Sequence, residues 1–171
     1  MTDHKEHLEI IKADVSHIPL IIALNEQVWP QTYIPIIGEQ QVAYMMGLFY
    51  TPEALKKQMT ELQHQFIICY YQGTPAAFAS YSAIEPGIYK LHKIYILPSM
   101  QGKGIGRYVL GYITDDIAAQ GATTLRLNVN IHNHAAKAFY EKTGFRHFKD
   151  EDIDIGGGYF MNDHVLSMPL E

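Results

Sequence analysis

Segments with helical and strand-like spacing of apolar residues alternate along the chain. Apolar side chains recur every third or fourth position in some segments, whereas β-branched and aromatic residues fill short runs between turn residues. These patterns predict helices over 15–29, 39–49, 52–62, 104–120 and 133–143, and strands over 7–12, 66–71, 76–83, 89–97, 124–130, 145–148 and 160–168. The order favours a mixed α/β domain, because neither a doubly wound parallel sheet nor a sandwich alternates in this way.

Turn and capping residues mark the predicted boundaries. Pro30 and Pro35 are expected to bound a loop after the first helix. The segment 72–75, Gln-Gly-Thr-Pro, lies between two apolar runs and predicts a hairpin turn. Asn133 is an expected N-cap of the last helix, and Gly144 follows its end.

Size and composition limit the class of protein. The 171 residues fit one domain over 1–171, with 47% hydrophobic and 18% charged residues. The net charge of −5 argues against a nucleic-acid binder. The N-terminus does not resemble a signal peptide, and no apolar stretch reaches the 18 residues of a membrane span, so a soluble cytoplasmic protein is expected.

A glycine-rich segment after the strand over 89–97 carries the first chemical signal. Gly102, Gly104 and Gly106 allow a tight turn, and a helix N-terminus with Lys103 and Arg107 beside it suits a pyrophosphate. A structural turn without a ligand is an equally open interpretation. The P-loop and dinucleotide-binding patterns do not match, because GxxxxGK[ST] and GxGxxG are both absent.

A second motif, NHAAKAFYEKTGF over 133–145, stands one strand further along. Together, QGKGIG and this motif resemble the [QR]xxGx[GA] loop and the NxxAxxFYxxxGF helix of the GNAT superfamily of acetyl-CoA-dependent N-acetyltransferases. The resemblance extends over nearly the whole chain. Within the family, YTPEALKKQM, LHKIYILPSMQGKGIG and LRLNVN are loosely most similar to the polyamine-acetylating branch.

The resemblance implies an α/β fold with a mostly antiparallel sheet of six or seven strands, splayed between the fourth and fifth strands, and about four helices. It also implies that acetyl-CoA lies at this splay, with no metal involved. The residues that would contact the cofactor are Ile94, Tyr95, Ile96, Gln101, Gly102, Lys103, Gly104, Ile105, Gly106, Arg107, Asn133, Ala136 and Tyr140. Asn133 could serve as N-cap, as a partner of the pantetheine arm, or as both.

Three residues are expected to act on the reacting atoms. The resemblance gives Tyr140 the role of general acid toward the departing thiolate, although a half-buried structural tyrosine is the alternative. It places a backbone N–H at or next to Ile96 toward the thioester oxygen. His92 lies where relatives often carry a glutamate base and has an ordinary pKa of ~6.5, which suits a base; a structural histidine is the alternative, and Glu85 is the reserve base.

The acceptor is expected to be a small cationic amine such as a polyamine. Tyr33, Glu85, Asp152 and Asp154 are the candidate substrate residues, although a solvated turn is the simpler interpretation of the acidic cluster over 150–163. His132 and His134 could suggest a metal, but two ligands alone are weak evidence. A protein N-terminal acetyltransferase and a non-catalytic CoA-binding domain are the alternatives, and a homodimer is a further expectation from the family.

Overall fold

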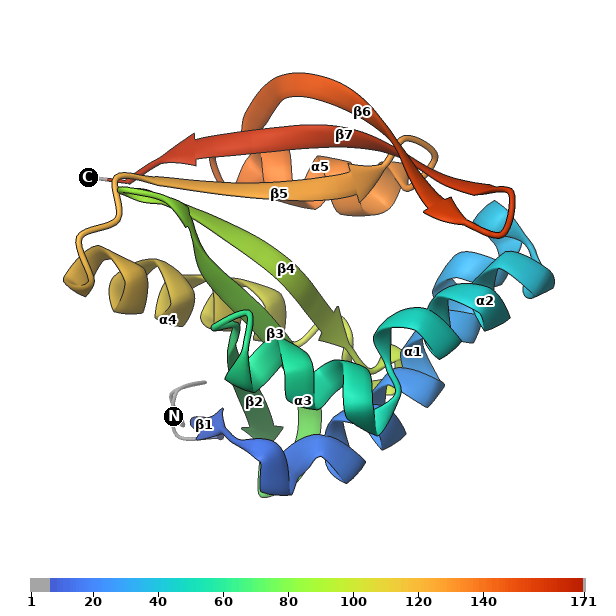
Figure 1. Ribbon diagram of the computed structural model, residues 1–171. Helices are drawn as coiled ribbons and strands as arrows, with labels where there is room; N and C mark the ends of the chain where they lie inside the picture. The colour runs from blue at the N-terminus through green and yellow to red at the C-terminus, as the bar shows by residue number, and fades with distance from the viewer. Residues whose placement is uncertain (1–6, 171) are drawn as a thin grey trace. The chain divides into compact units, whose positions relative to one another are not determined.

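The computed structural model describes residues 7–170 and contains a seven-stranded sheet (Figure 1). The strands are hydrogen-bonded in the order β1-β2-β3-β4-β5-β7-β6. They are β1 (Leu8–Ala13), β2 (Gln65–Tyr71), β3 (Thr74–Glu85), β4 (Ile88–Ile96), β5 (Thr124–Asn130), β6 (Arg146–Gly156) and β7 (Tyr159–Pro169). β4 pairs in parallel with β5, whereas β1–β2, β2–β3, β5–β7 and β6–β7 are antiparallel, which confirms the expected mixed sheet.

Five α-helices occur in the described residues, one more than the family resemblance suggested. They are α1 (Ile18–Ile37), α2 (Glu39–Phe49), α3 (Pro52–Thr60), α4 (Ile105–Ala119) and α5 (His134–Lys142). Short 3₁₀ turns occupy Val15–His17 and Pro98–Met100. None of the helices at 7–170 is long and apolar enough to cross a membrane.

The chain divides into two compact units, and β3, β4 and α4 each contribute residues to both. The first unit contains the chain up to Tyr81 together with Lys93–Gly111, and the second contains Ser82–His92 and the chain from Tyr112 onward. In the first unit, α1 packs against α2 and α3. In the second, β7 lies between β5 and β6, and Figure 1 shows the long β6–β7 hairpin. That residues 1–171 act as one domain remains a prediction.

The first helix is longer than predicted, because α1 continues through Pro30 and Pro35 to Ile37. A proline inside a helix removes one N–H donor and normally favours a break. Here Trp29 contacts Tyr33 one turn later, with tilted rings whose centroids lie 4.5 Å apart, and it also packs edge-on against Tyr50. This aromatic packing lies on both sides of Pro30 and offsets the lost hydrogen bond, so the predicted loop is wrong.

Two strand boundaries also differ from expectation. The turn between β2 and β3 consists of Gln72 and Gly73 alone, both with positive φ (50° and 80°), as in a two-residue type I′ hairpin. β6 extends over Arg146–Gly156, far beyond the predicted 145–148. The acidic cluster over 150–154 therefore lies in a strand and not in a solvated turn, because β7 pairs with it almost to the Gly157-Gly158 turn.

Candidate active site

The glycine loop of the first unit has the backbone conformation that the sequence suggested. Gly102 and Gly104 have φ values of 81° and 78°, which side chains other than glycine rarely adopt. A Cβ at either position would meet nothing within 4 Å, so the backbone angle and not crowding requires glycine. α4 begins directly afterwards at Ile105. An exposed helix N-terminus preceded by open glycines is a suitable anion site.

The side chains of this loop divide between solvent and core. Gln101 and Arg107 are exposed, whereas Ile105 is buried and so presents only its backbone outward. Lys103 is half-buried, and its Nζ lies 5.3 Å from the centre of the Tyr71 ring. This cation–π contact directs Lys103 along the protein surface, so Arg107 is the more exposed cation beside the loop.

The end of β4 presents two different faces. Ile94 and Ile96 share one face because side chains alternate along a strand. Tyr95 points the other way, into an aromatic cluster of the first unit that we define as Trp29, Tyr33, Tyr50, Phe78 and Tyr95. Tyr95 can therefore contribute only its backbone on the side of Ile94 and Ile96.

The ladder between β4 and β5 comprises four residue pairs, from Ile88↔Thr124 to Leu91↔Leu127. Both strands continue beyond it, β4 to Ile96 and β5 to Asn130. This short parallel ladder agrees with the predicted fold, in which the fourth and fifth strands separate.

Tyr33, a candidate substrate residue, belongs to the aromatic cluster. Its ring lies 6.3 Å from that of Tyr95, and Tyr33 remains half-buried, while Trp29 and Tyr50 are buried as expected for core residues. Burial raises the pKa of Tyr50 well above its usual value, with Tyr33 the next contributor. Tyr50 therefore stays neutral at physiological pH, and only Tyr33 among these three is open enough to contact a small molecule.

A buried cation adjoins this cluster and was not expected from the sequence. Lys93 is 9% exposed, and its Nζ donates to Gln58 Oε1 at 2.9 Å. The same Nζ lies 5.3 Å from the Tyr50 ring centre and 5.8 Å from that of Phe66. Gln58 in turn donates to the Phe49 carbonyl at 3.1 Å. Lys93 is thus held in the interior by an amide and two rings.

His92 pairs with a buried hydroxyl in the second unit. Its Nε2 lies 2.7 Å from Oγ of Ser82, which is 4% exposed. The hydroxyl fixes the ring orientation, and when it accepts the Nε2–H proton it leaves Nδ1 as the basic nitrogen. Glu85, the reserve base, is exposed at the end of β3. The structure therefore shows an oriented imidazole where a base was predicted.

Helix α5 is capped at both ends. Asn133 accepts a hydrogen bond from the backbone N–H of Ala136 at 3.3 Å, which confirms its N-cap role. At the other end, Phe145 N–H bonds to the Tyr140 carbonyl at 3.1 Å and Gly144 N–H to that of Glu141 at 3.3 Å. These two bonds form a Schellman motif.

The same motif fixes Tyr140, the predicted acid. Thr143 Oγ1 also donates to its carbonyl at 2.7 Å. Its ring packs edge-on against Phe145 at 5.6 Å and Phe139 at 5.5 Å, so that Tyr140 is 9% exposed. A phenol that is largely buried on a doubly capped helix end is well ordered, as a proton donor must be.

The register of the second unit sorts its polar residues by face. Lys90 pairs with Arg126, and Asn130 pairs with Asp163, which in turn pairs with Glu151. Because residues two apart share a face, His92, Asn128, Asp163 and Glu151 lie on one side of the sheet. We call this side the histidine face. Asp152 and Asp154 lie on the opposite side.

Asp163 is the buried member of the acidic cluster. It is 4% exposed, and Asn128 Nδ2 donates to its Oδ2 at 3.2 Å. Burial raises the pKa of Asp163, while the Asn128 hydrogen bond and the charge of Lys90 act in the opposite direction. A carboxylate held here can pair with a cation on the histidine face.

Comparison with known proteins decides the family. The sequence model described as "Acetyltransferase (GNAT) family" matches residues 29–145. This chain belongs to the GNAT family. This confirms the family resemblance and assigns the chain to the N-acetyltransferases.

Two curated proteins and one solved structure illustrate the similarity. A spermidine N(1)-acetyltransferase of Thermoplasma acidophilum is 25% identical over 158 residues, which cover 90% of this acetyltransferase and 95% of the relative. A ribosomal protein bS18-alanine N-acetyltransferase of Escherichia coli is 40% identical over 55 residues, 32% of this chain and 37% of the relative. The crystal structure of the PaiA N-acetyltransferase from Thermoplasma acidophilum in complex with coenzyme A has a TM-score of 0.80 and 23% identity, covering 95% of this chain and 98% of that one.

The sequence pattern did not single out three residues of this acetyltransferase. Ser82 and Lys93 lie in apolar strand runs, where only the tertiary structure shows their partners. Asp163 was one of several acids, and its burial depends on β7 being an inner strand. The available signal was the spacing of Asp163 and Val165, which lie two residues apart in a predicted strand and so share one face, the buried one.

Proposed function

We propose that this acetyltransferase transfers an acetyl group from acetyl-CoA to a primary amine of a small cationic molecule such as a polyamine. The observation that carries the proposal is the open glycine loop at the start of α4, in a chain that belongs to the GNAT family. Similarity over 90% of the chain to a spermidine acetyltransferase supports the acceptor class.

The residues present fit the cofactor's pyrophosphate. The exposed turn at Gly102 and Gly104 offers backbone N–H donors without a side chain in the way, Gln101 adds an exposed side-chain amide, and Arg107 adds a positive charge. Gly106 lies in the first turn of α4 and has no side chain, so it leaves room next to the helix N-terminus. Ile94 and Ile96 would pair with the pantetheine arm through their backbone, as the family pattern implies.

The reaction replaces one acyl bond by another. The amine nitrogen attacks the acetyl carbonyl carbon, the new C–N bond forms, and the C–S bond breaks as the coenzyme A thiolate leaves. His92, oriented by Ser82, accepts the proton that the ammonium or the tetrahedral intermediate loses. Tyr140 gives its phenolic proton to the thiolate, and the N–H of Ile96 stabilises the oxyanion. These roles remain predictions.

The acceptor's charge is matched by acids on the histidine face. Asp163 and Glu151 share this face with His92, whereas Asp152 and Asp154 lie on the other side of the sheet. Glu151 is half-buried and pairs with Lys149 at 3.6 Å. We therefore favour Asp163 and Glu151 over Asp152 and Asp154 for holding a second ammonium group.

A free-thiol assay with acetyl-CoA tests the activity against polyamines, amino acids, aminoglycosides and peptides. We expect CoA release with polyamines, and loss of turnover in Tyr140→Phe of about 100-fold, the scale of general acid catalysis. Tyr112→Phe, a half-buried tyrosine of α4, is the control and should retain activity. Binding of acetyl-CoA without turnover on any amine would instead support a non-catalytic CoA-binding domain.

The acceptor site is tested by charge removal on the two faces. Glu151→Gln and Asp163→Asn should raise KM for a diamine or polyamine about 10-fold and change KM for acetyl-CoA little, since a lost charge pair costs on the order of 1–2 kcal/mol. Asp152→Asn is the matched control on the opposite face. Equal effects of all three changes would refute the assignment to the histidine face.

Acetylation of a protein N-terminus is the second candidate. The identity of 40% over 55 residues with an alanine N-acetyltransferase favours it. Turnover on an alanine-initiated peptide that exceeds turnover on every polyamine would establish this alternative. Cytoplasmic location and a homodimer remain predictions.

A further inference from the structure

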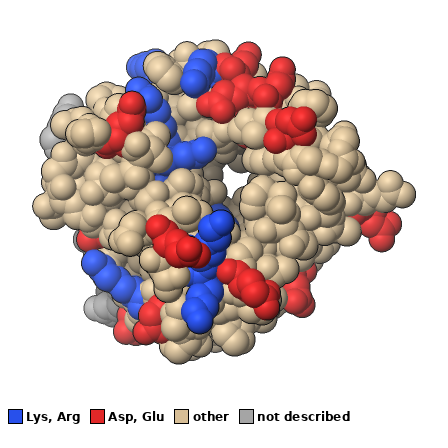
Figure 2. Space-filling model, in the orientation of Figure 1, with Lys and Arg blue, Asp and Glu red and all other residues tan. Residues whose placement is uncertain are grey.

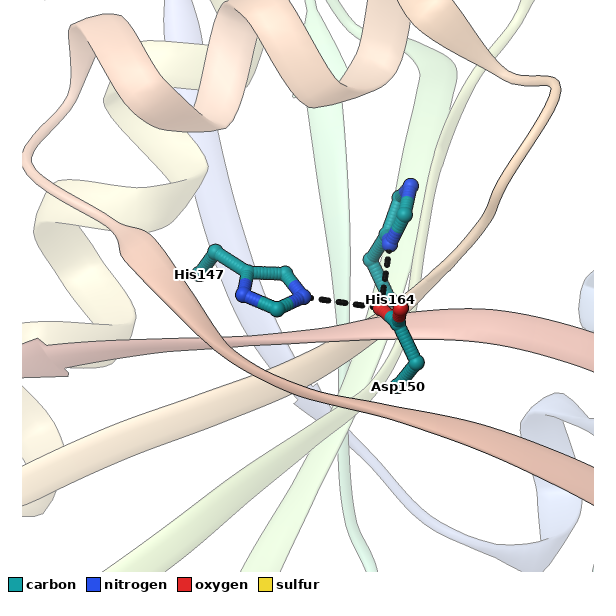
Figure 3. Close-up of side chains that lie close together, drawn as sticks. All are labelled: His147, Asp150 and His164. Atoms are coloured by element: carbon teal, nitrogen blue, oxygen red, sulfur yellow. Dashed lines mark hydrogen bonds and ion pairs between the residues drawn. The ribbon is translucent and has the colours of Figure 1, made fainter.

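Two histidines and an aspartate converge on one side of the β6–β7 hairpin (Figure 3). His147 Nε2 lies 2.7 Å from Asp150 Oδ1, and His164 Nδ1 lies 2.6 Å from the same oxygen. The ligand atoms of all three residues lie within 4.8 Å of one another. None of these residues has a role in the proposed acetyl transfer, and Asp150 faces away from His92.

A β-bulge brings the three side chains together. His147 pairs with Leu166 and Lys149 with Val165, so Phe148 is an extra residue in β6. In a regular strand His147 and Asp150, three residues apart, would point to opposite faces, but the extra residue reverses this relation. His164 stands directly opposite Asp150 in the register. Residues from two strands therefore share one face only because of the bulge.

Exposure and charge at the cluster suit a cation. The side chains of His147 and Asp150 are 47% and 64% exposed, whereas that of His164 is 21% exposed and anchors the group. The Asp150 carboxylate lies between the two imidazoles and supplies the negative charge of the group. Asp152 shares the face of Asp150, and Figure 2 shows acidic side chains gathered over this hairpin.

We propose that His147, Asp150 and His164 bind a divalent transition-metal ion such as Zn²⁺. Two imidazole nitrogens and one carboxylate oxygen form a donor set that zinc accepts, with water completing the coordination. Bonds of about 2.0–2.2 Å require ligand atoms roughly 3–3.5 Å apart, which small rotations of the two exposed side chains provide. Each neutral imidazole moves its proton to the other ring nitrogen, and the two hydrogen bonds to Asp150 are replaced by coordination.

The ion would clamp β6 to β7. His147 and Asp150 come from β6 and His164 from β7, so coordination links the two strands across their register. Binding to the folded state alone must raise thermal stability as metal concentration increases. This property is independent of acetyl transfer, so its failure would leave the proposed function untouched.

The test uses the full chain without a histidine tag. Zn²⁺ titration by isothermal calorimetry should give one ion per chain, and Co²⁺ should give the visible absorption of a low-coordinate site. Each of His147→Gln, Asp150→Asn and His164→Gln should weaken Zn²⁺ affinity at least 10-fold. His147 and Asp150 are exposed, so circular dichroism should show that these variants remain folded.

Two controls separate this cluster from other histidines. His17→Gln removes a pair of one histidine and one aspartate, in which His17 Nδ1 lies 3.3 Å from Asp14 Oδ1. A double change at His132 and His134 removes two histidines whose rings lie next to each other. Both controls should bind Zn²⁺ as the unchanged protein does. No saturable binding below about 100 µM Zn²⁺, or full binding in the His147→Gln/His164→Gln double variant, would overturn the proposal.

Discussion

Replacing Gly144 by alanine should destabilise the protein and disturb the end of α5. Gly144 has φ of 115°, outside the range that L-residues adopt readily, and it forms the turn of the Schellman motif. A Cβ at this position would lie 3.1 Å from Sδ and 3.7 Å from Cγ of Met168. The substitution therefore combines backbone strain with a close contact to a flexible side chain.

The expected loss of stability follows from the backbone strain and from the close contact with Met168. A residue held in a sparsely populated backbone region costs of order 1–3 kcal/mol, and Met168 can shift to relieve part of the contact. The lower entropy of the unfolded alanine chain returns about 0.4–1 kcal/mol. We expect a net loss of about 2 kcal/mol. With an unfolding entropy of about 2.1 cal/mol/K per residue, this corresponds to a Tm decrease of roughly 5–6 °C for 171 residues.

Thermal unfolding followed by calorimetry measures the effect, and Gly111→Ala is the matched control. Gly111 lies within α4, has no positive φ, and has open space around a Cβ, so alanine there should raise stability by about 0.5–1 kcal/mol. Gly144→Ala in a Met168→Ala background separates strain from contact. We expect more than half of the loss to persist there.

A comparison of the two glycine variants can refute the role of Gly144 in the turn. If Gly144→Ala is neutral or stabilising while Gly111→Ala behaves as expected, the left-handed turn after α5 is not required. The Tyr140 carbonyl accepts a hydrogen bond from the Phe145 N–H within this motif. Gly144→Ala should therefore also lower kcat, while KM for acetyl-CoA changes less. Unchanged kcat in a destabilised variant would show that the cap does not position Tyr140.

Three further predictions concern the thiol, the imidazole and the buried lysine. Cys69 is 1% exposed and burial raises its pKa to about 11, so it should resist thiol reagents at pH 8 until the protein unfolds. Since the folded pKa exceeds the unfolded value of 9.0, stability should fall as pH rises from about 9 to 11, and Cys69→Ala should lack this contribution. Ser82→Ala should lower kcat and displace the acidic limb of its pH profile while leaving KM for acetyl-CoA unchanged; an unaltered profile would exclude Ser82 from orienting His92. Gln58→Leu should lower stability by about 1–3 kcal/mol in urea unfolding, because the Lys93 ammonium loses a buried acceptor, and a neutral result would show that the Gln58 acceptor is not needed to hold Lys93.

Local signals predicted most helices and strands correctly. Asn133 caps α5 as predicted, because capping depends on residues three positions apart. The glycine loop was also visible, since positive φ values favour glycine wherever the chain folds. The prediction failed at Pro30, Pro35 and the end of β6, where contacts distant in sequence override local preference.

In the candidate site, too, local sequence signals predicted some residues and only tertiary contacts revealed others. The family resemblance was sufficient to select His92 and Tyr140 as candidates, and the glycine spacing selected the loop over 101–107. It could not select Ser82 or Asp163, because their significance depends on neighbours in other strands. Nor could it show which acids face His92, since the Phe148 bulge changes the alternation along β6.

The sequence by itself therefore determined the family, the order of the elements and the residue types of the glycine loop and of α5. The family followed from the resemblance of two motifs in register. The other properties follow from periodicity and from short-range steric and hydrogen-bonding requirements. The tertiary structure decided which side chains share a face and which are buried. A strand's faces depend on register and bulges, and these are set by pairing with segments that lie far away in the sequence.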